Sequence, residues 1–249
     1  MSIGLIVRLI VLALLVAFLV SPQSFAFVFA PLATGSQPVI YNQGSLLDLA
    51  LNHLLIVAIA TGLATIVAVS LAILVTRPFG AEFLPLSRSL ANIGQTFPPV
   101  AVLALAVPIL GFGTAPTLVA LFLYGLLPIF ENTLTGLTNL PPAVTEAARG
   151  MGMTGTQRLL RVELPLALPV ILAGIRLSTV ISLATATIGS TVAARTLGEV
   201  IIAGLLSNNT SFVLQGGLIV GALAVLIYDG LSAIEKRLTR RTGQGRATA

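Results

Sequence analysis

The sequence contains no cysteine, so it can form no disulfide and offers no thiolate for a metal or for nucleophilic attack. It has a single histidine, His53, which excludes a metal site built from several imidazoles. No paired carboxylates and no Ser-His-Asp spacing are visible, and charged residues make up only 8% of the chain. These absences indicate a non-catalytic protein that carries no cofactor or metal of its own.

Tryptophan is also absent, and the three tyrosines, Tyr41, Tyr124 and Tyr228, are scattered along the chain. A quaternary ammonium gains cation–π energy only when several aromatic faces surround it. The chain therefore has no obvious aromatic cage for such a cation.

Apolar residues, in contrast, are abundant: 56% of the chain is hydrophobic and its mean hydropathy is +1.05. Several apolar runs are long enough to cross the hydrocarbon core of a bilayer as helices. The composition predicts an all-α membrane protein with about six transmembrane helices. We expect them at Ile3–Val20, Leu49–Thr76, Ser89–Leu110, Thr114–Leu137, Pro165–Ser190 and Phe212–Ile234.

The net charge of +5 does not indicate a nucleic-acid partner, because most basic residues cluster in a few short segments. Ten of the thirteen share one side of the membrane if the six spans alternate and the N-terminus is inside. The other side then holds Arg195, while 21–48 has no basic residue. The basic side is the cytoplasmic one, and it holds Arg77, Arg88, Arg149, Arg158, Arg161, Lys236, Arg237, Arg240, Arg241 and Arg246.

Residues 1–48 are expected to form an N-terminal transmembrane helix followed by an extracytoplasmic loop. An alternative is a cleaved signal peptide, because Arg8 precedes an apolar stretch that ends at Ser24-Phe25-Ala26. Residues 49–237 form the expected membrane core, and 238–249 form a cytoplasmic tail. A polar loop at about 139–163 separates two of the core spans.

Local chemistry predicts two short helices in this loop. Pro141 and Pro142 fit a helix start, and Gly150 and Gly152 fit its end, because glycine takes left-handed angles without penalty. Thr154 and Gln157 then have the spacing of a capping box for a second helix, which Leu164-Pro165 is expected to end. From the residues alone, the loop either presents small side chains to another surface or merely caps its own helix ends.

The order of residues in the loop resembles a known motif. Glu146-Ala147-Ala148 is followed, after three intervening residues, by Gly152, and then by Val162 and Leu164-Pro165. This spacing resembles the EAA loop of the membrane-spanning subunits of ATP-binding-cassette (ABC) importers that work with a binding protein. Valine in place of isoleucine is the one departure.

The resemblance implies a type I ABC importer permease, with a five-helix core and an additional N-terminal helix, in a bacterial inner membrane. It implies that the EAA segment is a coupling helix seated on a separate ATPase subunit, which binds ATP and Mg²⁺. It further implies an extracytoplasmic substrate-binding protein and a second permease, either a copy of this chain or a paralogue. The coupling residues would be Glu146, Ala147, Ala148, Gly152, Leu164 and Pro165.

Residues 98–137, 148–157 and 162–176 resemble one branch of these permeases. That branch carries osmoprotectants such as glycine betaine and choline. Two departures weaken the substrate prediction. Relatives usually have a basic residue where Glu131 stands, and a GGLG where this chain has Arg195-Thr196-Leu197-Gly198. The same class of permease for another small solute, such as an amino acid, is therefore a second possibility.

Three charged residues fall inside expected spans: Glu131, Arg176 and Asp229. Because an unpaired charge is costly in lipid, we expect Arg176 to pair with one of the two acids. The cluster either changes between transport states or simply pins helices together.

Polar and small residues suggest a path for solute. Prolines break helix ladders and expose carbonyls, and hydroxyls spaced four apart on one helix either line a wet path or permit close packing. The candidate path residues are Gln95, Thr96, Pro98, Pro99, Ser178 and Ser182.

A rival from another class is a self-sufficient secondary transporter driven by an ion gradient. Such proteins usually have repeated halves and an ionisable site at the middle of the membrane. Neither feature is visible in the sequence. The chain also has no nucleotide-binding G-x-x-x-x-G-K-[ST] motif, so any ATP hydrolysis requires a partner.

Overall fold

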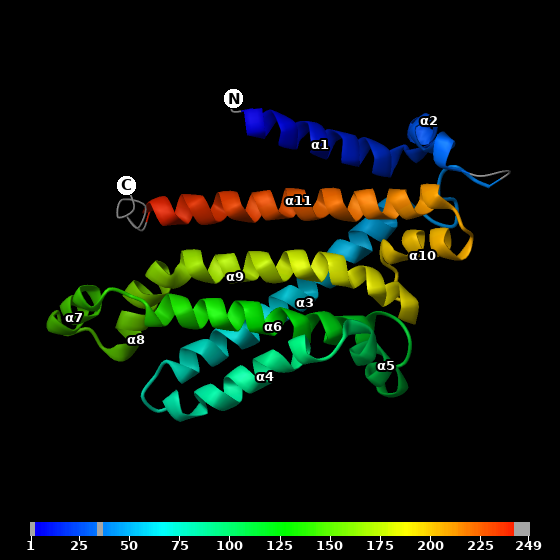
Figure 1. Cartoon of the computed structure of the whole chain (residues 1–249). Coiled ribbons are helices and arrows are strands. Elements are labelled where there is room, and N and C mark those ends of the chain that lie inside the picture. Colours follow the sequence, from blue (N-terminus) through cyan, green and yellow to red (C-terminus); the bar gives the residue numbers. More distant parts are fainter. Residues whose placement is uncertain (1–2, 34–36, 242–249) are drawn as a thin grey trace. The chain divides into compact units, whose positions relative to one another are not determined.

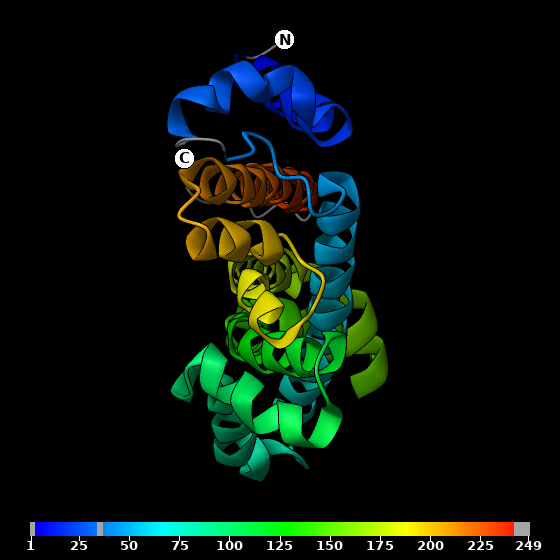
Figure 2. The ribbon, with the colours of Figure 1, turned by 90° about the vertical axis from the view of Figure 1, so that its right-hand side faces the viewer.

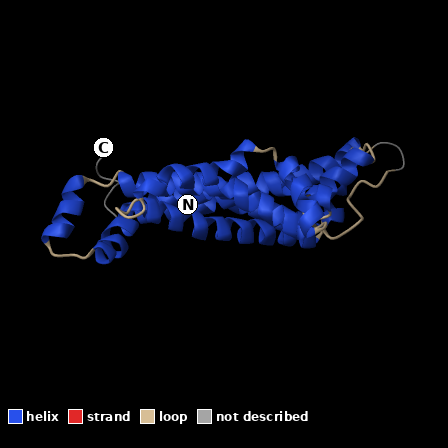
Figure 3. Cartoon of the chain, turned by 90° about the horizontal axis from the view of Figure 1, so that it is seen from below, coloured by secondary structure: helices blue, strands red, loops and turns tan. Residues whose placement is uncertain are grey.

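The computed structural model describes residues 3–33 and 37–241. Within these ranges the chain is helical, with turns and loops between helices (Figure 3). The last residues of the expected tail, 242–249, lie outside the described residues. The part that is described, up to Arg241, continues the last helix instead of forming a separate tail.

The long helices follow the apolar runs of the sequence closely (Figure 1). Four helical segments are long and apolar enough to cross a membrane, and the described chain has up to six spans if two bent helix pairs each count as one. The expected count of about six agrees with this upper number. The long helices are α1 (Ile3–Val20), α3 (Leu46–Val75), α6 (Thr114–Thr138), α9 (Leu164–Thr185) and α11 (Thr210–Arg241).

The expected span Ser89–Leu110 is not one helix. It consists of α4 (Leu84–Thr96) and α5 (Pro99–Leu110), which are bent by 97° at the break. Pro98 and Pro99 cause the break, because proline has no N–H to donate and disfavours helical angles in the residue before it. Phe97 accordingly has an extended backbone, with φ −97° and ψ 140°.

The segment after α1 is more ordered than the sequence suggests. It forms η1 (Pro22–Phe25), α2 (Ala26–Phe29) and η2 (Ala30–Leu32), at 116° to α1. The ring of Phe18 stacks on Phe29, with 5.4 Å between ring centroids. This turn was missed because its helical pieces are only three or four residues long, too short for a periodic signal.

Contacts between Cα atoms group the chain into two compact units. The first unit contains Met1–Ala60, Pro98–Leu121 and Val180–Ile227. The second contains Thr61–Phe97, Phe122–Thr179 and Tyr228–Ala249. The segments of the two units alternate along the chain.

The core of the first unit joins α1 to the first half of α11. Leu15, Phe18 and Leu19 of α1 belong to the same buried cluster as Phe212 and Ile219. Polar side chains just before and within α11 also hold the segment before α3: Asn209 Nδ2 donates to the Pro38 carbonyl at 2.9 Å, and Gln215 Nε2 donates to the Val39 carbonyl at 2.7 Å.

A further helix in the first unit, α10 (Gly198–Leu206), was not expected. It follows η5 (Ala186–Val192), a 3₁₀ extension of α9, and lies beside the first turns of α11 (Figure 2). Gly198 is essential to this connection, because a Cβ there would lie 1.9 Å from the Thr187 carbonyl oxygen. This is the glycine that the sequence retains from the GGLG pattern.

The core of the second unit depends on small residues of α3. Ala64, Ala68 and Ala72 recur every four residues, are fully buried and pack near Ile129 and Phe130 of α6. Small side chains at this spacing let two helices approach closely in a membrane, where apolar burial supplies little drive.

The backbones of α4 and α6 also approach closely in this unit. A Cβ built on Gly94 would lie 2.1 Å from the Leu123 carbonyl oxygen. No flexible side chain is involved, so the two backbones would have to separate to admit even one methyl group.

We therefore expect Gly94→Ala to lower the melting temperature of the purified protein in detergent, at a cost of about 1–3 kcal/mol for overpacking. Gly62→Ala is the matched control, because a Cβ at this exposed position in α3 meets nothing within 4 Å. A Gly94→Ala protein as stable as Gly62→Ala would contradict the close approach.

Candidate functional site

The polar loop contains the two short helices that its sequence predicts, and they lie beyond the end of α6 and the start of α9 (Figure 1). The first, α7 (Pro142–Gly150), begins with Pro142 after Pro141 as its N-cap. Glu146 and Ala147 are exposed on it, as expected for a docking surface. Ala148 is not exposed: the residue is only 1% accessible, so the prediction that it faces outward is wrong.

Gly152 ends α7 with a left-handed backbone, at φ +75°. The N–H of Gly152 donates to the Arg149 carbonyl at 2.9 Å, and that of Met153 donates to the Ala148 carbonyl at 3.2 Å. These two bonds are those of a Schellman motif. Gly150 remains within the helix, so only one of the two predicted glycine stops is used.

The second short helix, α8 (Gly155–Arg158), has the predicted capping box. Thr154 Oγ1 accepts from the Gln157 N–H at 3.3 Å, and Gln157 Oε1 accepts from the Thr154 N–H at 2.9 Å. Leu164-Pro165 does not end this helix, contrary to expectation. A π-helical turn, Leu159–Glu163, joins α8 directly to α9, so Leu164 and the exposed Pro165 form the first turn of α9.

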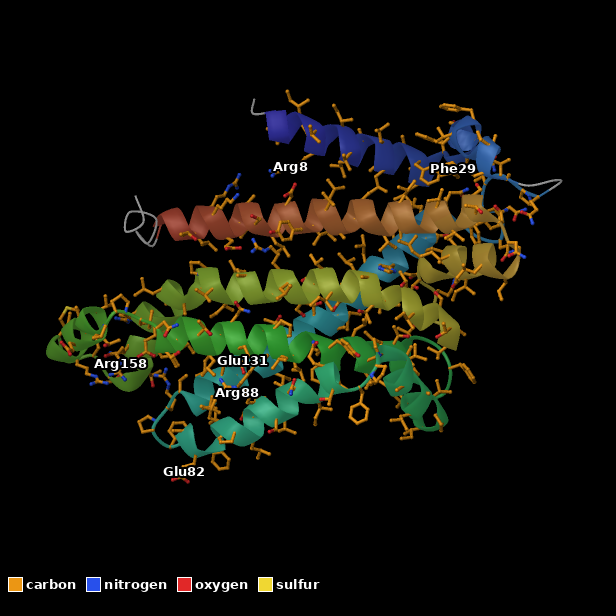
Figure 4. The ribbon with its side chains drawn as sticks, viewed as in Figure 1. Arg8, Phe29, Glu82, Arg88, Glu131 and Arg158 are labelled. Carbon is orange, nitrogen blue, oxygen red and sulfur yellow. The ribbon has the colours of Figure 1, made fainter. Side chains whose placement is uncertain are left out.

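Glu163, which sequence reasoning missed, is the most constrained acid of the loop. Its side chain is 7% exposed and accepts from two arginines, Arg77 Nη2 at 2.7 Å and Arg158 Nε at 2.7 Å. Arg77 follows the end of α3, and Arg158 lies in α8 (labelled in Figure 4). No sequence signal identified this triad, because residues five apart do not share a face of an α-helix and Arg77 is 86 residues away.

The candidate path residues of α4 lie where the helix breaks. Gln95, Thr96 and Pro98 are exposed and Pro99 is half-buried, but two carbonyls near the break are already hydrogen-bonded within the protein. The hydroxyl of Tyr124 donates to the Phe97 carbonyl. In return, Gln95 Nε2 donates at 3.0 Å to the Tyr124 carbonyl.

That second bond has its own cause in α6. The N–H four residues after Tyr124 would normally satisfy its carbonyl, but Pro128 stands there and has none. Gln95 supplies the missing donor. The expectation that these carbonyls meet water or a polar solute is therefore wrong for the Phe97 and Tyr124 carbonyls in this structure.

Two other candidate path residues are enclosed. Ser178 and Ser182 of α9 are fully buried, so in this structure they line no accessible path. A Cβ on Gly125 of α6 would lie 2.8 Å from Ser178 Oγ, which shows how closely the helices pack there. The spacing of four on α9 serves helix packing, the alternative left open by the sequence.

The predicted ion pair of Arg176 with Glu131 is not formed. Arg176 Nη1 lies 2.6 Å from Glu235 Oε2, as a close charge contact without hydrogen-bond angles, and its guanidinium lies 4.7 Å from the centroid of the Tyr228 ring. Tyr228 and Glu235 are seven residues apart and share one face of α11, which continues past the expected end of the span. Glu131 instead pairs with Arg88 at 2.6 Å (Figure 4).

Residues 68–241 match the family described as the inner membrane component of binding-protein-dependent transport systems. The match includes the polar loop and most of the long helices. The chain belongs to this family. It is thus a multi-pass inner membrane protein, as its apolar helices indicate.

Three similar proteins have names that state the solutes they carry. The chain is 40% identical over 201 residues to the osmoprotectant import permease protein OsmY of Salmonella typhimurium, covering 81% of this chain and 85% of the relative. It is 39% identical over 207 residues to the glycine betaine/carnitine/choline transport system permease protein OpuCB of Bacillus subtilis, covering 82% and 93%. It is 40% identical over 199 residues to the choline transport system permease protein OpuBB of Bacillus subtilis, covering 80% and 90%.

The fold is similar to that of solved importers. A chain of the MetNI methionine ABC transporter in an inward-facing conformation aligns with a TM-score of 0.68 at 21% identity, covering 76% of this chain and 94% of that chain. A chain of an amino acid ABC transporter solved with histidines aligns with a TM-score of 0.60 at 18% identity, covering 78% and 92%. At these identities the likeness establishes the fold alone, the permease fold expected from the EAA motif.

The exchange of hydrogen bonds around Tyr124 can be tested directly. Tyr124→Phe keeps the ring but leaves the Phe97 carbonyl without its donor, which should cost about 0.5–1.5 kcal/mol, the net contribution of a typical hydrogen bond. Tyr228→Phe is the control, since the ring beneath Arg176 is retained. Equal melting temperatures for the two variants in detergent would contradict a stabilising role for the Tyr124 hydroxyl.

Proposed function

We propose that this chain is the membrane permease of an ATP-driven importer for osmoprotectants such as glycine betaine, choline or carnitine. The observation that carries the proposal is identity of about 40% over four-fifths of the chain to permeases named for these solutes. The chain covers most of each relative, so the similarity extends beyond the loop motif.

In the proposed mechanism, a separate binding protein selects the solute and the permease offers it a path. The scarcity of aromatic residues supports this division, because the chain has too few ring faces for an evident cation cage. Gln95, Thr96, Pro98 and Pro99 remain the proposed wall of the path, at the exposed break between α4 and α5. A second permease, a copy or a paralogue, would supply the opposite wall.

Energy would come from separate ATPase subunits that bind ATP and Mg²⁺. The proposed docking element is α7, on which Glu146 and Ala147 are exposed and followed by the glycine turn at Gly152. A small side chain such as that of Ala147 lets a partner approach closely. Ala148, Leu164 and Pro165 would act indirectly, Ala148 as the buried residue of α7 and the other two as the first residues of α9.

The experiment that tests the function is uptake into proteoliposomes containing the permease, its ATPase and its binding protein. Glycine betaine, choline or carnitine should enter only when ATP and the binding protein are both present. Uptake that persists without ATP and is abolished by ionophores would instead support an ion-gradient-driven transporter. If the binding protein recognised only amino acids, the importer assignment would stand and the substrate assignment would be wrong.

The coupling loop gives a second prediction, based on backbone geometry. Gly152→Val forces a β-branched residue into left-handed angles, at a local cost of about 1–3 kcal/mol. We expect ATP-driven uptake to fall sharply while ATP hydrolysis continues, because the turn that presents α7 is displaced.

Gly150→Val is the matched control for bulk. Gly150 is also exposed, lies two residues away, and has open space around a built Cβ, but its backbone is not left-handed. Uptake and hydrolysis should both be affected less than in Gly152→Val. Equal loss of uptake in the two variants would mean that bulk on the docking surface, and not the turn, matters.

A further inference from the structure

The π-helical turn Leu159–Glu163 makes the Arg158–Glu163 contact possible. In an α-helix, residues five apart are separated by about 140° around the axis, since each residue turns about 100°. A π turn takes more residues per turn and brings such a pair onto one face, here with Arg158 Nε 2.7 Å from Glu163 Oε1. The contact therefore depends on the wound state of this one turn.

Glu163 is tied at the same time to α3. Arg77 Nη2 lies 2.7 Å from Glu163 Oε2 and also donates to Thr76 Oγ1 at 3.2 Å. The carboxylate thus has one arginine on each oxygen, one from the loop and one from the end of a long helix. Removing either arginine leaves the buried charge with the other.

The surroundings leave room for these side chains to move. A cleft of about 890 Å³ has Arg77, Arg158 and Glu163 in its wall, together with Thr138 at the end of α6 and Arg149 of α7. Arginine side chains at the edge of such a cleft can change partners without repacking an apolar core. The triad is therefore a contact that can be exchanged, unlike the alanine packing of α3.

We propose that Glu163 is a positioning residue that transmits displacement of the α7–α8 loop to α3 and α9. While Arg158 and Arg77 both hold Glu163, displacement of α8 is passed to the end of α3 and to the start of α9. If the π turn rewinds as α-helix, Arg158 turns away from Glu163 and this link between α8 and α3 is broken. This role rests on the proposed function, because it requires that an ATPase subunit displaces the loop. Glu163 itself touches neither ATP nor solute.

A purely structural salt bridge and a positioning triad give different results. A structural role predicts that loss of the triad weakens the loop and with it the binding of the ATPase. A positioning role predicts that the ATPase still binds and hydrolyses ATP, but that hydrolysis no longer drives uptake. The ratio of solute imported to ATP hydrolysed distinguishes the two.

The test uses the full complex of permease, ATPase and binding protein in proteoliposomes. In Glu163→Gln, copurification of the ATPase should be retained, and the ratio of solute imported to ATP hydrolysed should fall by at least about fivefold, the lower end of typical coupling between sites. Glu82→Gln is the control, because it removes an exposed carboxylate from the connection between α3 and α4. Its ratio should equal that of the wild type.

Arg158→Gln provides a second variant in case Glu163→Gln does not fold. It leaves Glu163 neutralised by Arg77, so folding is retained, and it removes only the contact that depends on the π turn. Its ratio should also fall, and Arg158→Lys, which keeps the charge, should restore part of it.

Normal ratios in both Glu163→Gln and Arg158→Gln would overturn the positioning role. Loss of ATPase binding in Arg158→Gln would overturn it in favour of structural support. Failure of the wild-type complex to import solute with ATP would instead overturn the proposed function, and the positioning role with it.

Discussion

A carboxylate buried in the protein needs compensating charge, and much of the loop's geometry follows from meeting that need at Glu163. Desolvation favours the neutral acid, whereas two guanidinium groups, which cannot be deprotonated in proteins, favour the carboxylate. Bringing Arg158 to it requires a π turn, and bringing Arg77 to it fixes where the chain lies after α3. The loop is consequently anchored at its second half, while α7 remains exposed at the first.

A related constraint governs the broken helices of the second unit. Within a bilayer no water replaces a lost backbone hydrogen bond, so each carbonyl freed by proline needs a partner from the protein. Tyr124 meets this need for α4 with its hydroxyl, and Gln95 meets it for α6 with its amide. Each of the two helices thus donates a side-chain hydrogen bond to a backbone carbonyl of the other segment. Both bonds require the close approach of α4 and α6 that Gly94 permits.

The features that the sequence predicts are those with local signals. Apolar runs locate the long helices, the spacing of Thr154 and Gln157 predicts the capping box, and Gly152 predicts the left-handed turn. Features that depend on contacts between distant segments were missed. Glu235 was missed as a partner of Arg176 because α11 extends beyond its apolar part and places this acid, two turns after Tyr228, on the same face.

Burial explains why the candidate site was only partly predictable. Ala147 and Ala148 are the same residue type, yet Ala147 is exposed and Ala148 is almost completely buried. The reason is that side chains of adjacent residues on a helix point about 100° apart. A motif of small residues gives no indication of which member packs inward. Burial of Glu163 could not be predicted either. In the sequence, a single acid in a basic loop resembles a solvated surface charge, and only the fold brings Arg77 to it.

The loop combines two kinds of support with different mechanical consequences. Gly152 and the Thr154 cap are local, so they fix the shape of the loop without linking it to any helix outside it. Glu163 is the point at which that shape is joined to α3 and α9 by charge. A force applied at the exposed face of α7 must pass through the glycine turn and α8 before it reaches Glu163. Leu159 of the π turn also packs against the buried cluster of Leu137, Ala167 and Ile171, so the loop has an apolar anchor beside the charged one. Of the two, only the charged contact can change partners without disturbing apolar packing.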